Sequence, residues 1–352
     1  MLKSLKRFCI SLLLGANLCT IVLMWLCVGL TYISPSILPR LSLLTLAFPV
    51  FLCINLLFTA FWLLFQARLT WVPLAGMLLV GSHIFDYTPL RIQSNDIRSD
   101  STLTIISYNA CFVSTNEKQE ELIQFLTTAD ADIICLQEIA SYFFDKHKHW
   151  LKENAYQVRQ SQSAAILSRL PFLGDAIHID YPTRSNNSFA CWVNHGGDSL
   201  LVVNNHLESN QLSEEQKDDY AHSIADPNSQ NIQRSSRMLI GKLSEAAKYR
   251  GAQTDSICSF VERHANHSVI VCGDLNETPI SYTYQSLDRR LTSAYRKAGI
   301  GPGFTYSRRT FPVRIDHLFF SNDWTCTSCT IDKTVSASDH YPLLVRLTPK
   351  TQ

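Results

Sequence analysis

Two long runs without a charged residue lie near the start of the chain. Residues 8–33 form an uncharged run of 26 residues, and residues 41–65 form one of 25. About 20 apolar residues suffice to cross a bilayer as a helix. A third run, residues 69–85, has 17 residues and contains Pro73, but helices of water-soluble domains are seldom this apolar on all faces. We therefore predict that residues 1–85 are a membrane anchor with about three transmembrane helices.

Lys3, Lys6 and Arg7 precede the first run and resemble the charged start of a cleavable signal peptide. The run after them is too long for the apolar core of such a peptide, and a second run follows, so we favour an uncleaved span. Basic residues stay on the cytoplasmic side, and four of them against two place the amino terminus inside. With three spans, the protein is expected to be integral to the plasma or inner membrane, with its carboxyl-terminal domain extracytoplasmic.

The remainder of the chain has a different composition. Residues 1–95 contain six Lys or Arg and one acid, Asp86, which leaves 25 basic and 29 acidic residues for residues 96–352. This slightly acidic part lacks the basic excess that attracts nucleic-acid phosphates irrespective of sequence. Residues 86–102 are polar and rich in turn formers, so we expect a linker there. Residues 103–352 would then form one domain.

Short apolar runs and an amphipathic segment alternate along this domain. Residues 103–108 and 132–138 are predicted strands, and between them Leu122, Phe125 and Leu126 have the i, i+3, i+4 spacing of a helix. Such alternation is typical of an α/β domain. Further strands are expected at residues 164–168, 200–204, 269–271, 314–320 and after 340, and a long helix is expected at residues 231–249, continuing towards 261.

Polar residues follow the expected strands at six places. A single acid or histidine at a strand end is usually structural, and residues 269–279, VIVCGDLNETP, could by themselves be a strand and a polar turn. Six such ends favour a site, because open α/β sheets place sites at the carboxyl ends of strands. The set combines oxygen ligands for a Mg²⁺-type ion with groups that exchange protons. Its members are Asn109, Glu138, His206, Asp274 with Asn276, Asp316, and Asp339 with His340.

Seven motifs in this order resemble the endonuclease/exonuclease/phosphatase superfamily. The superfamily includes DNase I-like nucleases, apurinic endonucleases, inositol polyphosphate 5-phosphatases and neutral sphingomyelinases. The resemblance covers essentially residues 103–347. It implies a four-layer α/β sandwich, two packed β-sheets flanked by helices, and metal-assisted hydrolysis of a phosphate ester. The motifs are Asn109, LQE ending at Glu138, SRLP at 168–171, NHL at 205–207, GDLN at 273–276, RID at 314–316 and SDH at 338–340.

The resemblance implies a metal site and a proton-transfer pair. Glu138 would be the principal ligand of Mg²⁺ or Mn²⁺, with Asn109 helping to hold the metal. Asp339 would supply a second metal ligand or contribute to the electrostatics of the site. His340 would be the general base or a phosphate-contacting acid, oriented by Asp316. These residue types suit the reaction, because charge that accumulates on a phosphoryl group is stabilised by a metal and by donors fixed beforehand.

The resemblance also implies contacts to water and substrate. Asp274 would position or deprotonate the attacking water, and Asn276 would donate a hydrogen bond to the phosphate. His206 would contact a nonbridging oxygen or protonate the leaving group. From the residues themselves, Arg184 and Asn187 could contact substrate phosphate from a loop, although solvated turn residues are the alternative.

Some features match the superfamily less closely or have two interpretations. Apurinic endonucleases place a catalytic tyrosine between the LQE and GDLN motifs, and Tyr156 and Tyr181 lie there without a matching context. Arg250 and Gln253 could face the site from the long helix or be exposed helix polarity. The spacing Cys326-x-x-Cys329 would allow a disulfide if the domain is extracytoplasmic.

The leading functional prediction is a membrane-anchored, divalent-metal-dependent phosphoesterase, most simply a phosphodiesterase. Its substrate would be a phosphate ester, either a lipid headgroup or a nucleic acid, and no protein partner is expected. A nuclease acting on extracellular DNA or RNA is the first alternative, against which the acidic domain argues. A catalytically inactive module that binds a lipid or partner is the second. The intact set of acids and histidines argues against it.

The charge bias generates a prediction about topology. A reporter enzyme fused after Gln352 should be active only outside the cytoplasm, because three crossings separate it from the basic amino terminus. A matched fusion after Arg68, at the end of the second expected span, should be active only inside. Cytoplasmic activity of the fusion after Gln352 would reverse the predicted orientation.

Overall fold

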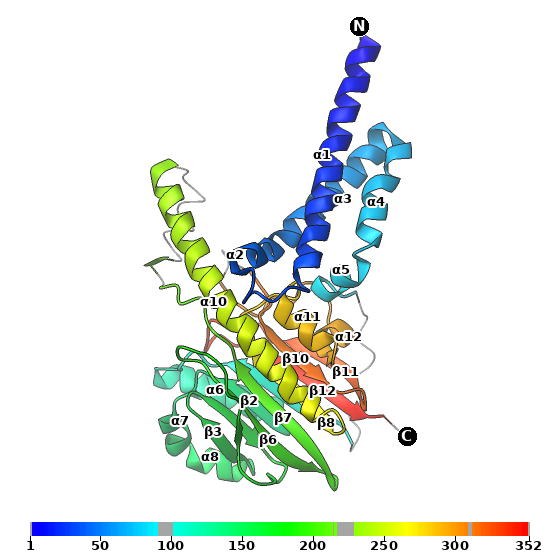
Figure 1. Cartoon of the computed structure of the whole chain (residues 1–352). Coiled ribbons are helices and arrows are strands. Elements are labelled where there is room, and N and C mark those ends of the chain that lie inside the picture. The colour runs from blue at the N-terminus through cyan, green and yellow to red at the C-terminus, as the bar shows by residue number, and fades with distance from the viewer. Residues whose placement is uncertain (1, 91–100, 214, 217–228, 309–311, 351–352) are drawn as a thin grey trace.

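The computed structural model describes residues 2–90, 101–213, 215–216, 229–308 and 312–350. Apolar helices from the amino-terminal quarter stand at one end of the molecule, and the sheets of the carboxyl-terminal domain lie at the other (Figure 1). The long helix α10 (Ser229–Arg263) runs along the domain and continues upward beside the amino-terminal helices.

The amino-terminal part agrees with the expected anchor in length and composition. Lys3–Leu30 and Pro39–Phe65 are each long and apolar enough to cross a membrane. A third crossing is obtained if Ala67–Leu78 and Gly81–Tyr87, which bend by 69° at the break between them, form one span. The elements are α1 (Leu2–Leu30), α2 (Pro39–Ser42), η1 (Leu43–Ala47), α3 (Phe48–Phe65), η2 (Ala67–Leu69), α4 (Trp71–Leu78) and α5 (Gly81–Tyr87).

A polar cluster joins α1 to α3 inside the anchor. Asn17 is fully buried and donates a hydrogen bond of 3.0 Å to the side-chain oxygen of Asn55. Its own side-chain oxygen accepts a bond of 3.1 Å from the indole of Trp62. Side-chain amides that bond across helices hold them together in an apolar environment, where an unpaired amide would be costly.

The domain contains two six-stranded sheets. Their strand orders are β11-β12-β1-β2-β4-β3 and β5-β6-β7-β8-β10-β9. Each sheet has a parallel pair near its centre, β1 with β2 and β7 with β8, whose carboxyl ends lie at the same edge. The strands are β1 (Leu103–Asn109), β2 (Ile133–Gln137), β3 (Gln157–Ser161), β4 (Ala164–Ser168), β5 (Ile177–His178), β6 (Ser188–His195), β7 (Asp198–His206), β8 (Ser268–Asp274), β9 (Thr292–Ser293), β10 (Asp316–Phe320), β11 (Trp324–Ile331) and β12 (Leu343–Pro349).

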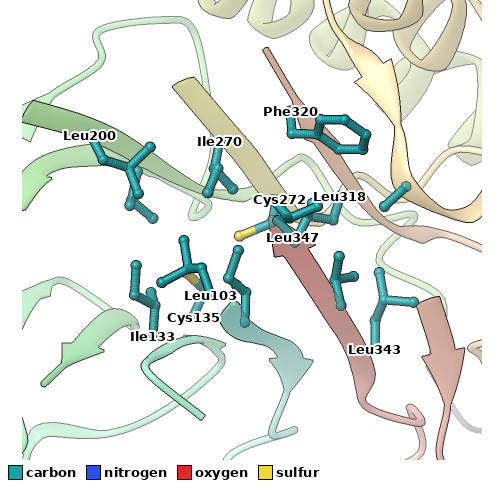
Figure 2. Close-up of a cluster of buried hydrophobic side chains, with 14 of the residues drawn as sticks. Leu103, Ile133, Cys135, Leu200, Ile270, Cys272, Leu318, Phe320, Leu343 and Leu347 are labelled. Atoms are coloured by element: carbon teal, nitrogen blue, oxygen red, sulfur yellow. The ribbon is translucent and has the colours of Figure 1, made fainter. Parts of the chain in front are cut away.

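Apolar side chains fill the space between the sheets (Figure 2). Ile133 and Cys135 of β2 lie there with Ile270 and Cys272 of β8, while the intervening Ile134 faces the outer helices. Successive strand residues point to opposite faces, so an unbroken apolar run indicates a strand covered on both sides.

Helices cover the outer faces and complete the predicted four-layer sandwich. Leu122 of α6, Phe143 of α7 and Trp150 of α8 pack in the cluster outside the first sheet. Ile257 of α10 and Tyr284 of α11 pack outside the second. Besides α10, the helices of the described part of the domain are α6 (Asn116–Ala129), α7 (Ser141–Lys146), α8 (Lys148–Glu153), α11 (Tyr282–Asp288) and α12 (Ala294–Ala298).

Buried amides link the two sheets near the carboxyl ends of their parallel strand pairs. Gln137, the last residue of β2, donates a 2.6 Å hydrogen bond to the side-chain oxygen of Asn204 on β7. The amide nitrogen of Asn204 in turn donates to the carbonyls of Leu136 and Ala165, each at 2.9 Å. These bonds fix the carboxyl ends of the two parallel pairs relative to each other, which a purely apolar interface would do less specifically.

The structure bears on the expected linker and on the possible disulfide. Asp86 and Tyr87, expected in the linker, end α5 and contact the domain, and residues 91–100 lie outside the described residues, so the limits of the linker stay a prediction. Cys326 and Cys329 are both free thiols, and the possible disulfide is absent. Both lie on β11, with a register shift between Cys326 and Ser328, and Cys329 is buried in the core between the sheets.

The junction of β7 and β8 generates a stability prediction. Gly273 has φ +133°, and a Cβ there would lie 1.9 Å from the carbonyl oxygen of Asn205. Gly273→Ala should therefore lower the free energy of unfolding by at least about 2 kcal/mol, since both the backbone and the neighbouring strand must shift. Thermal or denaturant unfolding of the detergent-solubilised protein measures this.

Gly241, in α10, is the matched control, because a Cβ at that position meets nothing within 4 Å. Gly241→Ala should raise stability by roughly 0.5 to 1 kcal/mol through helix propensity. Equal effects of the two substitutions would contradict the close approach at Gly273.

Candidate active site

Strand register brings most of the predicted residues to one edge of the sandwich. In the second sheet His206 pairs with Asp274 across β7 and β8, and Asp274 pairs with Asp316 across β8 and β10. In the first sheet, Asn109 ends β1 and Glu138 directly follows β2. These residues are far apart in the sequence but lie close together in space, because the carboxyl ends of the two parallel strand pairs are adjacent.

Asn109 connects the carboxylates of the two sheets. Its amide nitrogen donates to Oδ2 of Asp274 at 3.0 Å and to Oε1 of Glu138 at 3.3 Å. Its side-chain oxygen accepts a 3.0 Å hydrogen bond from the backbone nitrogen of Cys111, which fixes the orientation of the amide. Glu138 has φ +50° and a side chain that is 24% exposed, so its carboxylate lies at the rim of the site.

Asp274 is the buried centre of the group. Its Oδ1 accepts a 2.8 Å hydrogen bond from the backbone nitrogen of Asn276, whose φ of +51° turns the chain back towards the carboxylate. The side-chain nitrogen of Asn276 donates to the carbonyl of Leu207 at 3.1 Å. Burial and the nearby carboxylate of Asp316 raise the pKa of Asp274 above its ordinary value, although His340 and His206 partly oppose the rise.

His340 and Asp316 form a buried pair beside Asp274. Nδ1 of His340 lies 2.8 Å from Oδ2 of Asp316, and Nε2 lies 3.8 Å from Oδ2 of Asp274. Burial alone would lower the pKa of His340, but Asp316 and Asp274 outweigh it and raise the pKa to about 10. At neutral pH the imidazole therefore carries a proton on each nitrogen.

Residues outside the predicted set hold this pair in place. The hydroxyl of Ser338 donates to the carbonyl of Asn109 at 2.8 Å and accepts from the backbone nitrogen of His340 at 3.1 Å. The hydroxyl of Thr305 accepts from the backbone nitrogen of Asp316 at 3.1 Å. Ser338 begins the SDH motif and could have been singled out, whereas nothing near Thr305 in the sequence signals its position.

His206 completes the group from the end of β7. Its Nε2 lies 3.4 Å from Oε1 of Glu138 and 4.0 Å from Oδ2 of Asp274. Neither ring nitrogen makes a hydrogen bond within the described protein, although the ring is buried. Burial lowers the pKa of His206, so the neutral ring has a buried nitrogen available to a ligand between the two carboxylates.

The donor set fits a divalent metal. Among the described residues, ligand atoms of Asp274, Asp316 and His340 lie within 4.8 Å of one another. This trio differs from the predicted ligands, and the proton on His340 makes its imidazole a poor metal ligand at neutral pH. Glu138, by contrast, offers a carboxylate at the rim beside the unpaired ring of His206. Hard oxygen donors of this kind suit Mg²⁺ or Mn²⁺.

Asp339 and Glu138 both lie within electrostatic range of Cys111. Both acids act on the thiol of Cys111, whose pKa is raised to about 12 by burial first and then by Asp339 and Glu138. The side chain of Asp339 is half-buried, and its carbonyl accepts a 2.8 Å bond from the backbone nitrogen of Ser307. Its proposed part in metal binding stays a prediction, as do the roles of the other site residues.

The loop residues proposed for substrate contact lie in two environments. The guanidinium of Arg184 pairs with Glu245 on α10 and stacks 5.0 Å from the ring centre of Tyr249. Asn187 is buried, its carbonyl accepts from the backbone nitrogen of His206 at 3.0 Å, and its side-chain oxygen has no described partner. Asn187 is thus adjacent to the site, while Arg184 is occupied on the surface of α10.

Residues on α10 support the loops around the site. Arg250 is buried and donates to Glu277 at 2.6 Å and to the carbonyl of Glu208 at 2.8 Å. Gln253 accepts a 2.9 Å bond from the backbone nitrogen of Glu208. Glu277, the residue after Asn276, is therefore held by an ion pair. Arg250 and Gln253 are therefore buried, and they bind the loops around the site through Glu208 and Glu277.

Comparisons with known families agree with this geometry. A family model described as the Endonuclease/Exonuclease/phosphatase family matches residues 259–340, the segment that carries Asp274, Asp316 and His340. A model described as a domain of unknown function (DUF8431) matches residues 10–87. No curated protein matches the chain.

Solved structures share the fold at low sequence identity. The human Nocturnin catalytic domain is 16% identical, with a TM-score of 0.52, over 72% of this chain and 97% of that one. The endonuclease/exonuclease/phosphatase from Bacteroides vulgatus is 15% identical, with a TM-score of 0.51, over 71% of this chain and 100% of that one. A protein of the same description from Beutenbergia cavernae is 14% identical, with a TM-score of 0.51, over 71% and 72%. The shared fold and the matched family model show that the domain has the endonuclease/exonuclease/phosphatase fold and is similar to that family over residues 259–340.

Proposed function

We propose that the protein is a membrane-anchored phosphodiesterase that uses a divalent metal ion and water to hydrolyse a phosphate ester. The observation that supports this most is the convergence on Asp274: Asn109 donates to it, and the rings of His340 and His206 lie within 4.0 Å. A buried carboxylate flanked by one protonated and one neutral imidazole offers both proton acceptance and anion contact.

Glu138 is the proposed principal metal ligand, with Asp339 as a second ligand and Asn109 as the residue that orients the carboxylate of Glu138. Mg²⁺ or Mn²⁺ would supply Lewis-acid stabilisation of charge on the phosphoryl oxygens. The fit rests on oxygen donors at the rim and on the buried His206 ring, which has no described hydrogen-bond partner.

The remaining residues are proposed to transfer a proton or to contact the phosphate. Asp274 is the proposed acceptor of a proton from the attacking water, because its raised pKa makes it a better base than an ordinary carboxylate while leaving it ionisable near neutral pH. His340, whose proton is stabilised by Asp316, is the proposed contact to the phosphate, which favours the acid role over the general-base role. Asn276 has a second amide N–H for a phosphate oxygen, and His206 is the proposed contact to a nonbridging or leaving oxygen.

The proposed substrate is the phosphodiester of a lipid headgroup. The anchor holds the domain beside the bilayer, and the domain has an acidic excess that disfavours nucleic acid. A panel of lipid vesicles, single- and double-stranded nucleic acid and inositol phosphates, assayed with and without EDTA, separates these classes. Preferential cleavage of nucleic acid would favour the nuclease alternative.

Metal dependence and the site residues are tested together. The full-length protein in detergent should hydrolyse the soluble diester bis(p-nitrophenyl) phosphate with Mg²⁺ or Mn²⁺ and lose this activity in EDTA. Glu138→Ala and His340→Ala should each lower kcat by about 10²-fold or more, because each removes charge stabilisation or proton transfer in the transition state.

The exposed residues Glu120 and His149 provide matched controls, and Glu120→Ala and His149→Ala should leave kcat within about twofold. Metal-independent hydrolysis, or unchanged rates in both site variants, would overturn the proposed mechanism.

The pH dependence follows from the two shifted pKa values. Asp274 must be ionised, so kcat/KM should rise with pH through an acid limb above the ordinary carboxyl pKa of 3.8. His340 must be protonated, so kcat/KM should fall as pH rises through about 10. Asp316→Asn removes the main charge that retains the proton and should move the basic limb to lower pH.

Asp145→Asn, on the exposed face of α7, is the control and should leave both limbs in place. A basic limb that does not respond to Asp316→Asn would show that His340 is not the group that titrates.

A further inference from the structure

The loop after β8 runs from the site into the anchor. Asp274 ends β8, and Ile280, six residues later, is fully buried. Ile280 packs in an apolar cluster with Met24 and Cys27 of α1 and Phe48 of α3. Among the described buried residues of this cluster, Ile280 is the one that comes from the carboxyl-terminal domain. The segment that carries Asp274 and Asn276 is therefore fixed to the domain at one end and to the anchor at the other.

A second contact follows the same loop. The carboxylate of Asp86, at the end of α5, accepts a 2.9 Å hydrogen bond from Gln285 and lies 3.0 Å from the guanidinium of Arg296. Gln285 also donates to the carbonyl of Pro279 at 3.1 Å. The side-chain amide of Gln285 thus joins Asp86, at the end of α5, to Pro279, the residue before Ile280. The loop is therefore held to the anchor both by this amide and by the apolar packing of Ile280.

The strand that carries Asp316 is attached to the anchor as well. Arg314, two residues before Asp316, is buried and donates to the carbonyls of Asp86 and Tyr87. Its guanidinium stacks 4.1 Å from the ring centre of Tyr295. Since β8 and β10 are paired with Asp274 opposite Asp316, both acids lie at strand ends that continue into contact with the anchor.

We propose that Ile280 is a positioning residue, through which the anchor holds the loop of Asp274 and Asn276 in its active geometry. The anchor is then part of the catalytic unit as well as a tether. This inference rests on the proposed phosphodiesterase function only for its kinetic readout. The physical reason is that the described apolar partners of Ile280 in its cluster come from the anchor, so α1 and α3 hold the far end of the loop in addition to the domain contacts of Asn276 and Glu277.

The test uses the full-length protein in detergent and the soluble bis(p-nitrophenyl) phosphate with Mg²⁺. Ile280→Ala should lower kcat about tenfold or more and change KM less than about threefold, because a small displacement of reacting groups affects the transition state more than binding. Ile280→Val, which keeps most of the apolar contact, should restore kcat to within about threefold of the wild type.

Leu52→Ala is the matched control. Leu52 is buried in the same cluster on α3, and its replacement removes a similar volume from the anchor side while leaving the side chains of the loop after β8 unchanged. Its kcat should stay within about twofold of the wild type, although its thermal stability should fall as that of Ile280→Ala does. Equal losses of kcat in the two variants, or wild-type kcat in a folded Ile280→Ala, would overturn the proposal.

Hydrogen exchange separates this inference from the proposed function. Amides of residues 274–281 should exchange at least tenfold faster in Ile280→Ala than in Leu52→Ala, whether or not the diester is hydrolysed. If the wild type does not hydrolyse the diester but the exchange difference is present, the proposed function fails and the positioning role stands. Equal exchange in the two variants would refute the positioning role even in an active enzyme.

Discussion

The carboxylate of Asp274 is the group on which the rest of this site depends. It is buried where the two sheets meet, and a buried carboxylate is tolerated only when donors and opposite charge surround it. Asn109 supplies a donor from the first sheet, the backbone of Asn276 supplies one from its own loop, and His340 supplies a positive charge. The groups that stabilise the buried carboxylate of Asp274 are also those proposed to contact the phosphate or to transfer protons during its hydrolysis.

The second carboxylate, Asp316, makes this arrangement asymmetric. It faces Asp274 across β8 and β10, and its charge, together with burial, raises the pKa of Asp274. The imidazole of His340 lies between them, 2.8 Å from Asp316 and 3.8 Å from Asp274, and so relieves the repulsion while its own proton is strongly held. His206 is neutral because burial lowers its pKa, although the carboxylate of Glu138 lies 3.4 Å from its Nε2. Two histidines in one site thus acquire different protonation states from their surroundings.

The anchor changes how the domain is to be understood. A simple tether would end in a linker, whereas α5 ends in buried polar contacts with Gln285 and Arg314, and the loop of Asp274 places Ile280 among anchor helices. Separating the two parts would expose Ile280 and deprive the buried guanidinium of Arg314 of the carbonyls of Asp86 and Tyr87. Helices that are apolar enough to cross a membrane and strands that carry the proposed catalytic acids therefore share one packed interface.

The sequence by itself determined the apolar spans, the α/β alternation and most of the strand-end residues, because apolar periodicity and the order of motifs are properties of neighbouring positions. It did not reveal the polar edge strand β3, the supporting hydroxyls of Ser338 and Thr305, or the ion pair between Arg250 and Glu277. The bond from Ser338 to the carbonyl of Asn109 and the ion pair of Arg250 with Glu277 join residues that are 229 and 27 positions apart. Only the tertiary structure decided that Arg184 is occupied on α10, that Cys326 and Cys329 are free, and that Ile280 belongs to the anchor core. The physical reason is that these contacts depend on how helices and strands pack against one another in the folded protein, and the pattern of neighbouring residues in the sequence does not specify that packing.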